Sequence, residues 1–211
     1  MSQDDLRCGV RPAEELDYLV PDIVEFFAGA ANILDVGCSN GALLLRLHER
    51  LAGADLSGVD ISDARVQLAR QSAPFADLHV ADAQQALPFG DSQFEAVSCI
   101  EVIEHLDAPG ALVDEIYRVL KPGGKLFLTT PNVDAMMRIV RPHKWYGLED
   151  PSHLIFFNEF SLRHLLTKKS FAVVGSKIES RTGNGLLDGF MAVLRRGGQL
   201  QLRAIKTGGP R

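Results

Sequence analysis

The stretch ILDVGCSNGALLLRL, residues 33–47, decides how this chain folds. Apolar residues run into an acid, Asp35, then into a turn of small residues, and then into an amphipathic pattern. Gly37 and Gly41 allow the backbone to turn sharply and allow a ligand to approach it closely. A helix beginning after Asn40 presents N–H groups that have no partner within the helix, and these attract an anion. The stretch therefore predicts a strand, a ligand-binding turn and a helix.

The acid in this turn restricts the chemistry of the ligand. A carboxylate at Asp35 repels a diphosphate but attracts an ammonium group, while the helix start favours an anionic group. A ligand that carries both a carboxylate and an amine satisfies the two conditions together. The methionyl end of S-adenosylmethionine is such a ligand.

Outward from this stretch, apolar runs alternate with amphipathic segments along the chain. This alternation predicts an α/β fold: a doubly wound, mostly parallel seven-stranded sheet with helices on both faces. In such sheets ligands bind at the carboxyl ends of the strands, where the strand order reverses. The expected strands are 32–36, 56–60, 78–82, 94–101, 125–131, 171–178 and 199–206, and the expected helices are 13–28 (interrupted at Pro21), 41–52, 63–72, 109–120, 159–168 and 185–196.

The turn DVGCSNG resembles the D-x-G-x-G-x-G signature of the class I S-adenosylmethionine-dependent methyltransferases, with Ser39 in place of the middle glycine. The segments LPFGDSQFEAVSCIEVIEHL (87–106) and LKPGGKLFLTTPN (120–132) are similar to the fourth- and fifth-strand blocks of that family. Within it, HKWYGLEDPSHLIFFNEFSLRHLL (143–166) resembles the small ubiquinone-biosynthesis, or "methyltransferase 23", type. The resemblance covers about residues 30–180 and implies the Rossmann-like methyltransferase fold.

The resemblance implies S-adenosylmethionine as the cofactor and assigns acids at successive strand ends to it. Asp60 would accept hydrogen bonds from the ribose hydroxyls, and Asp82 would accept one from the adenine amino group. Ala83 would donate its backbone N–H to the adenine ring, and Ile61 would lie against one face of that ring. The full set expected to bind the cofactor is Asp35, Gly37, Cys38, Asn40, Gly41, Asp60, Ile61, Asp82, Ala83 and Ile100.

Two histidines are the candidate catalytic residues. His105 follows the fourth strand, and His153 lies in the segment expected to cover the acceptor. Imidazole titrates near neutral pH, so either side chain is suited to take a proton from a hydroxyl acceptor. Each also has a structural reading: a loop contact for His105 and a backbone hydrogen bond for His153. A third alternative stays open, in which Glu101, Glu104, His105 and His153 bind a divalent metal, as in the metal-using RNA 3′-end methyltransferases that the E-x-x-E-H pattern resembles.

The length of 211 residues suits a single domain, here a methyltransferase domain over residues 1–211. Residues 1–30 are expected to form an N-terminal helical lid, and 31–180 the cofactor-binding core. Residues 132–157 are expected to cover the acceptor. The apolar side chains expected to line the acceptor pocket are Met136, Met137, Trp145, Tyr146, Phe156 and Phe157.

The composition narrows the function further. A net charge of −5 disfavours a nucleic-acid partner, and no apolar run is long enough to span a membrane. The three scattered cysteines and the absence of a secretory signal predict a cytoplasmic protein. The prediction is a transferase that moves a methyl group to a small-molecule acceptor, with oxygen favoured because a histidine base is available. The rivals are a nicotinamide oxidoreductase, which would need G-x-G-x-x-G, a non-catalytic methyltransferase-like partner and an RNA methyltransferase. The sequence leaves the oligomeric state open.

Overall fold

The computed structural model describes residues 13–180, 186 and 197–208. The helix expected over 185–196 lies outside the described residues, apart from Leu186. The strands are β1 (Asn32–Val36), β2 (Asp55–Asp60), β3 (Asp77–Val80), β4 (Phe94–Ile100), β5 (Leu120–Pro131), β6 (Phe171–Glu179) and β7 (Gln199–Lys206). The helices are η1 (Ala13–Leu16), α2 (Val20–Phe27), α3 (Ala42–Arg50), α4 (Asp63–Ser72), η2 (Ile103–His105), α5 (Pro109–Val119), α6 (Met136–Val140), η3 (Pro142–Lys144), α7 (Tyr146–Glu149) and α8 (Glu159–Lys168).

The strands form one seven-stranded sheet in the order β3-β2-β1-β4-β5-β7-β6. All neighbouring pairs from β3 to β5 are parallel, and β7 runs antiparallel to both β5 and β6. The prediction of a mostly parallel seven-stranded sheet is therefore confirmed. The strand order reverses between β1 and β4, so the carboxyl ends of these two strands flank the crevice in which a ligand is expected.

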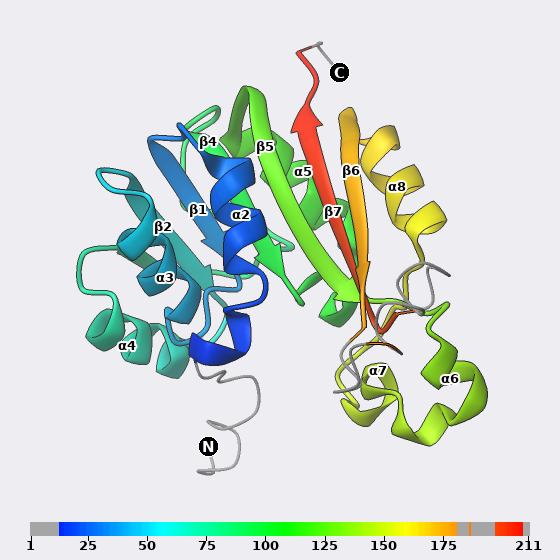
Figure 1. The fold of residues 1–211 in the computed structure, drawn as a ribbon. Coiled ribbons are helices and arrows are strands. Elements are labelled where there is room, and N and C mark those ends of the chain that lie inside the picture. The colour runs from blue at the N-terminus through cyan, green and yellow to red at the C-terminus, as the bar shows by residue number, and fades with distance from the viewer. Residues whose placement is uncertain (1–12, 181–185, 187–196, 209–211) are drawn as a thin grey trace.

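Helices cover both faces of the sheet and divide the core into two parts (Figure 1). On one face, α2, α3 and α4 pack on Ile33, Ala96 and Phe127. On the other face, α5 and α8 pack on the neighbouring residues Leu34 and Val97. Successive residues of a strand point to opposite faces of the sheet, so a strand that is buried on both sides must be apolar at every position. The central strands of this sheet are apolar at nearly every position.

Helix-capping side chains set the ends of two helices where the sequence predicts them. The Ser62 hydroxyl accepts a hydrogen bond from the Arg65 N–H at the start of α4. Asn158 and Ser161 form a reciprocal capping box at the start of α8. In each case a side-chain oxygen accepts a hydrogen bond from a backbone N–H group at the start of the helix, where the N–H groups have no partner within the helix.

Two strand boundaries differ from the prediction by more than one residue. The strand expected over 125–131 begins at Leu120, because Leu120 pairs with Phe94 of β4. Residues 121–124, with a positive φ at Gly123, form an irregularity between this pair and the pair of Lys125 with Ala96. The third strand ends at Val80 rather than at residue 82, so Asp82 lies in the loop beyond the strand. The backbone at Asp82 is therefore not part of the hydrogen-bonded ladder of the sheet.

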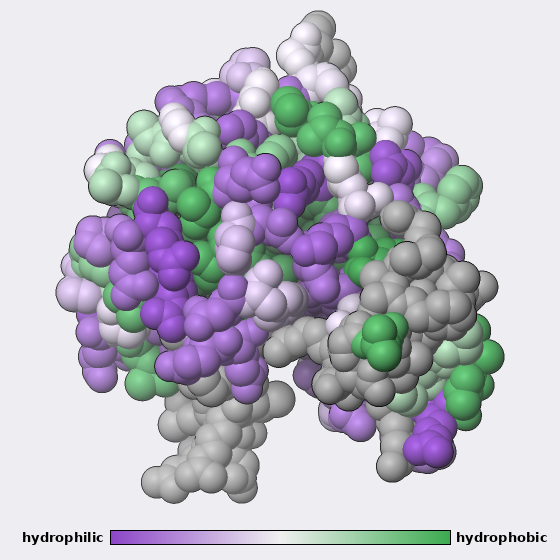
Figure 2. All heavy atoms as spheres, viewed as in Figure 1, coloured by the Kyte–Doolittle hydropathy of each residue, from purple (hydrophilic) through white to green (hydrophobic). Residues whose placement is uncertain are grey.

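The segment between β5 and α8 extends beyond the carboxyl end of β5 and carries η3 and the short helices α6 and α7 (Figure 1). Apolar side chains gather on the outer surface of α6, where Ile139 and Val140 are exposed (Figure 2). In the described parts of the chain, none of the helices combines the length and the hydropathy that crossing a bilayer requires.

Candidate cofactor and acceptor site

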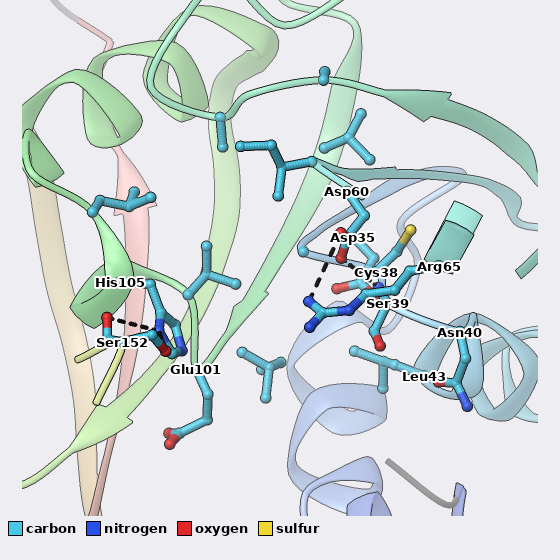
Figure 3. A pocket seen from close by; sticks show the side chains of 18 of the residues that line it. Asp35, Cys38, Ser39, Asn40, Leu43, Asp60, Arg65, Glu101, His105 and Ser152 are labelled. Atoms are coloured by element: carbon cyan, nitrogen blue, oxygen red, sulfur yellow. Dashed lines mark hydrogen bonds and ion pairs between the residues drawn. The ribbon is translucent and has the colours of Figure 1, made fainter. Parts of the chain in front are cut away.

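A cavity of about 460 Å³ opens at the carboxyl ends of β1, β2 and β4. The turn after β1 and the end of β2 form one wall, and η2 with the 146–153 segment forms the opposite wall (Figure 3). All of the residues predicted to bind the cofactor, except Gly41, line this one cavity, and so do both candidate histidines. Residues from five separate stretches of the sequence therefore meet at the point where the strand order reverses.

The turn after β1 depends on two glycines for different reasons. Gly37 has a φ of 78°, and a Cβ atom there would lie 2.3 Å from a methyl carbon of Val102. Gly41, with a φ of 79°, is the N-cap of α3, and its missing side chain faces Ala69 and Ser72 of α4 instead of the cavity. The position of Gly41 is thus explained by backbone conformation and helix packing, and the structure does not bring it to the cavity.

Ser39 adopts a backbone conformation that explains the usual glycine at this place in the signature. Its φ is 48°, in the left-handed region that glycine adopts at least cost. The Ser39 N–H donates to a carboxylate oxygen of Asp60 at 3.0 Å. The hydrogen bond ties the turn after β1 to the end of β2, the two elements that line the same wall of the cavity.

Asp35 is buried near the carboxyl end of β1, 3% exposed, and lines the cavity. Burial raises the pKa of Asp35 to about 7, against the lowering effect of the hydrogen bond from the Ser98 hydroxyl, and Asp60 adds a smaller upward effect. A carboxylate this poorly solvated gains much from a cationic partner. The position is therefore suited to an ammonium group, as the sequence suggests.

Asp60 is the buried acid at the end of β2. Its two carboxylate oxygens accept hydrogen bonds from the N–H groups of Ser39 and Ser62, at 3.0 and 2.9 Å. A guanidinium nitrogen of Arg65, from α4, lies 4.0 Å from one of these oxygens and also faces the cavity (Figure 3). Each carboxylate oxygen can accept a further hydrogen bond, so the N–H contacts orient the side chain and leave it able to accept from hydroxyl groups.

The loop after β3 supplies the third acid. Asp82 accepts hydrogen bonds from the Gln84 N–H at 2.9 Å and from the Gln85 amide at 3.1 Å, which fix the loop as a tight turn. Ala83 is buried behind it, while the side chain of Ile61 is 68% exposed at the cavity edge. An exposed aliphatic side chain beside a polar turn offers a flat aromatic ring both an apolar contact and hydrogen-bonding groups.

The opposite wall holds the two histidines, whose ring centres lie 4.6 Å apart. His105 Nδ1 lies 2.9 Å from the Ser152 hydroxyl oxygen and 3.2 Å from the Ser152 carbonyl oxygen (Figure 3). His153 Nδ1 lies 2.8 Å from the Gly147 carbonyl oxygen. A carbonyl oxygen only accepts, so Nδ1 of His153 carries the proton and its Nε2 is the basic nitrogen.

The structure narrows the metal alternative to three of its four residues. The ligand atoms of Glu104, His105 and His153 all lie within 4.8 Å of one another, whereas the Glu101 carboxylate accepts hydrogen bonds from Thr129 and Gln199. A carboxylate with two imidazoles suits a divalent cation, and the Gly147 carbonyl orients the His153 ring as a second-layer contact does in metal sites. The residues present therefore fit a divalent cation without requiring one.

Glu101 has a second distinctive feature. Its φ is 55°, a conformation that a glutamate adopts at some cost, and such positions concentrate at functional sites. The Glu101 carboxylate lines the cavity and is joined through Gln199 to the Tyr18 hydroxyl, which donates to the Gln199 amide oxygen at 2.8 Å. The N-terminal segment, the end of β4 and the start of β7 thus meet behind one cavity wall.

Only one of the six apolar residues expected to line the acceptor pocket does so. Tyr146 lines the cavity, but Trp145 and Phe157 are buried in the protein interior, and Met137 is exposed on α6. Sequence reasoning instead missed several polar and charged lining residues, because each reaches the cavity through tertiary packing. These are Arg65, Gln84, Asp150 and Ser152, together with Glu101, which was considered only as a metal ligand.

A family model described as a methyltransferase domain matches residues 12–175. The chain is 32% identical over 128 residues to a ubiquinone biosynthesis O-methyltransferase of Pseudomonas paraeruginosa, an alignment that covers 58% of this chain and 54% of that one. It is 39% identical over 106 residues to the protein of the same name from Xanthomonas oryzae, covering 48% of this chain and 44% of that one. The chain thus spans about half the length of the curated relatives it matches.

The fold is shared with a solved structure described as a SAM-dependent methyltransferase from Archaeoglobus fulgidus. The TM-score is 0.72 with 18% identity, and the match covers 92% of this chain and 95% of that chain. At this level of identity the likeness shows the fold, while the family is shown by the match to residues 12–175.

Proposed function

The chain belongs to the class I S-adenosylmethionine-dependent methyltransferases, and we propose that it transfers the methyl group of this cofactor to an oxygen atom of a small organic acceptor. The observation that carries the proposal is that the cofactor cradle and two histidines share one cavity. The cradle consists of the turn after β1 with Asp35, Asp60 and Asp82. The names of the relatives, which are O-methyltransferases, support oxygen as the acceptor atom.

Each wall of the cavity has its own task in this proposal. Asp35 receives the ammonium group of the cofactor, the start of α3 receives its carboxylate, and Asp60 accepts from the ribose hydroxyls. When bound, the cofactor supplies a methyl group on a positively charged sulfur, which needs alignment and exclusion of water more than covalent help. His105 lies across the cavity from Asp60 and takes the proton of the acceptor hydroxyl at Nε2.

The cofactor assignment is tested by calorimetry and thermal unfolding with S-adenosylhomocysteine. We expect the melting temperature to rise with S-adenosylhomocysteine and to stay unchanged with NAD⁺, since binding to the folded state alone stabilises it. Asp60→Ala should weaken S-adenosylhomocysteine binding by about tenfold or more, as two hydrogen bonds to a buried carboxylate are lost. Asp55→Ala is the matched control, because Asp55 is exposed at the opposite end of the same strand. Unchanged affinity in Asp60→Ala would show that the ribose does not lie at the end of β2.

The acceptor assignment is tested by following the production of S-adenosylhomocysteine with phenols, catechols, aliphatic alcohols and amines. Turnover with hydroxyl acceptors, and its loss in His105→Gln, is the expected result. Turnover confined to amines would overturn the choice of oxygen. Cofactor binding without turnover on any acceptor would favour a non-catalytic partner, and RNA binding that weakens steeply with salt would favour an RNA methyltransferase.

Two further elements belong to the proposal. Residues 132–157 cover the acceptor, which is supported by Tyr146, Asp150, Ser152 and His153 reaching the cavity from that segment. Residues 1–30 act as a lid; positions 1–12 lie outside the described residues, and Leu16 in the cavity wall supports this role for the rest of the segment. The cytoplasmic location predicted from the sequence is checked by cell fractionation.

A further inference from the structure

Arg65 extends from the first turn of α4 toward the cofactor cradle. Its backbone N–H donates to the Ser62 hydroxyl, which caps the helix. Its side chain lines the cavity, and the guanidinium group faces the Asp60 carboxylate (Figure 3). Only 26% of this side chain is exposed. The helix therefore directs a charged hydrogen-bond donor into the site and not out into the solvent.

The stability of α4 does not explain an arginine at this position. The first turn of a helix carries a partial positive charge, so a cationic side chain there is unfavourable, whereas an acid such as Asp63 is favourable. Arg70, in the last turn of the same helix, has the favourable placement and donates to the Leu78 carbonyl oxygen at 3.1 Å. A role for Arg65 must therefore come from what its side chain faces in the cavity.

Arg65 and Asp60 lie beside each other without a direct hydrogen bond. The guanidinium nitrogen and the carboxylate oxygen of the pair are 4.0 Å apart, which is beyond hydrogen-bonding distance. That oxygen accepts instead from the Ser62 N–H at 2.9 Å, and the second oxygen accepts from the Ser39 N–H at 3.0 Å. Two backbone donors thus fix the carboxylate, and the guanidinium places a positive charge and further N–H groups next to it.

A carboxylate beside a guanidinium complements a pair of neighbouring hydroxyl groups. Each hydroxyl has one proton to donate and two lone pairs that accept, while Asp60 only accepts and Arg65 only donates. A ribose hydroxyl that donates to Asp60 still needs a donor for its own oxygen once water has left the cavity. A planar guanidinium offers two N–H groups in a fixed fork to adjacent oxygens, which the ammonium group of a lysine does not.

The charges around the cavity place this cation at the ribose end. Among the described residues that line the cavity, Arg65 is the one lysine or arginine, and it faces a lining that is rich in acids. The lining acids are Asp35, Asp60, Asp82, Glu101 and Asp150. Arg65 and Asp60 lie on one side of the cavity, across from His105 (Figure 3). The guanidinium is therefore next to the acid assigned to the ribose and away from the histidines.

We propose that Arg65 is a further cofactor-binding residue: it donates to the ribose hydroxyl oxygens whose protons Asp60 accepts, and the two side chains together select a ribosyl cofactor over its deoxyribosyl analogues. The inference rests on the proposed function, because it takes the ribose to lie at the end of β2. No covalent bond changes and no proton is transferred in this contact, so both side chains keep their charges.

The test combines changes in the protein with changes in the ligand, measured by calorimetry. Wild type and Arg65→Met are titrated with S-adenosylhomocysteine and with its 2′-deoxy and 3′-deoxy analogues. Arg65→Met should bind S-adenosylhomocysteine about tenfold more weakly than wild type, because hydrogen bonds from a charged donor are lost. For at least one deoxy analogue the same substitution should cost less than about threefold, because the hydroxyl that Arg65 contacts is already missing.

Two further variants separate this hydrogen-bonding role from other roles. Arg65→Lys keeps the charge without the forked donor, and its affinity for S-adenosylhomocysteine should stay at least about threefold below that of wild type. Arg70→Met removes an exposed guanidinium from the same helix and should bind S-adenosylhomocysteine as wild type does. Unliganded Arg65→Met should melt within about 3 °C of wild type, because the N–H groups of Ser39 and Ser62 still hold Asp60. The calorimetry then compares folded proteins.

Three results would overturn the inference. The first is unchanged affinity for S-adenosylhomocysteine in Arg65→Met. The second is an equal loss of affinity for all three ligands, since Arg65 would then act without touching a hydroxyl. The third is full recovery in Arg65→Lys, since the charge alone would then be sufficient. If folded wild type binds neither S-adenosylhomocysteine nor S-adenosylmethionine, the proposed function itself fails, whereas binding by wild type with any of the three results leaves it standing.

Discussion

The Ser98 hydroxyl donates a 2.8 Å hydrogen bond to the Asp35 carboxylate, between two adjacent strands and with both side chains buried. One hydroxyl replaces only part of the solvation that a carboxylate has in water. The protein therefore keeps an acid that is half protonated near neutral pH, at the place where the ligand's ammonium group is expected. Two predictions come from this pair.

Asp35→Asn should stabilise the unliganded protein above pH 7. Because the pKa of folded Asp35 is about 7 and that of an unfolded aspartate is ~3.9, the folded state holds a proton that the unfolded state has released. The free energy of unfolding should consequently fall by up to about 4 kcal/mol as pH rises from about 4 to about 7. Asn stays neutral, so urea unfolding should show Asp35→Asn as the more stable form at pH 8 and the two forms converging near pH 4. A variant less stable than wild type at pH 8 would contradict this account.

Binding of S-adenosylhomocysteine at pH 7 should release up to about half a proton from Asp35. An ammonium group beside the carboxylate favours its ionised form and lowers its pKa in the complex. Calorimetry in phosphate and in Tris measures the release, since the two buffers differ in their heats of ionisation. Asp35→Asn should bind more weakly and lose the release. Equal proton release in wild type and Asp35→Asn would show that the ammonium group does not lie beside Asp35.

Gly37→Ala should cost more stability than Gly29→Ala. Both glycines have a positive φ, but a Cβ at Gly29 meets nothing within 4 Å, whereas one at Gly37 meets Val102 at 2.3 Å. Gly29→Ala thus measures the backbone strain alone, about 1–2 kcal/mol. Gly37→Ala adds the clash and should also abolish S-adenosylhomocysteine binding, and Gly37→Ala/Val102→Ala should recover part of the stability. If urea unfolding shows that the two substitutions lower the free energy of unfolding equally, the turn after β1 can rearrange to accommodate a Cβ atom at residue 37.

Tyr18→Phe should weaken S-adenosylhomocysteine binding a few-fold if the N-terminal segment is a lid. The lost hydrogen bond to Gln199 should cost about 1 kcal/mol of stability, which urea unfolding measures. Calorimetry then separates the two roles. A loss of stability with unchanged affinity would make the segment a structural support of the sheet.

The sequence predicts elements well where the deciding interactions are local. The strand before Gly37 and the helices that begin at Asp63 and Glu159 are found as expected, because apolar periodicity and neighbouring capping residues set them. Leu120 shows the limit: it was expected to end a helix, but backbone pairing with β4 draws it into β5. That pairing depends on a strand more than twenty residues away, which no local pattern contains.

The candidate site divides in the same way. Asp35, Asp60 and the glycine turn follow strands directly, so their places at the sheet edge can be derived from the sequence. The contact between His105 and Ser152 joins positions that are 47 residues apart, and no local sequence pattern around either residue predicts it. Trp145 was expected in the pocket for its aromatic character, yet a large ring gains most from full burial, and the fold places it inside.

The antiparallel position of β7 between β5 and β6 has a consequence for biogenesis. Among the described strands, β6 hydrogen-bonds only to β7, so it has no ladder until residues 199–206 have emerged from the ribosome. Gln199, the first residue of that strand, also completes the contact behind Glu101. A nascent chain halted before this strand should already have the turn after β1 with Asp35 and Asp60 but lack the Gln199 contact behind Glu101, so any activity should appear only once β7 has been made.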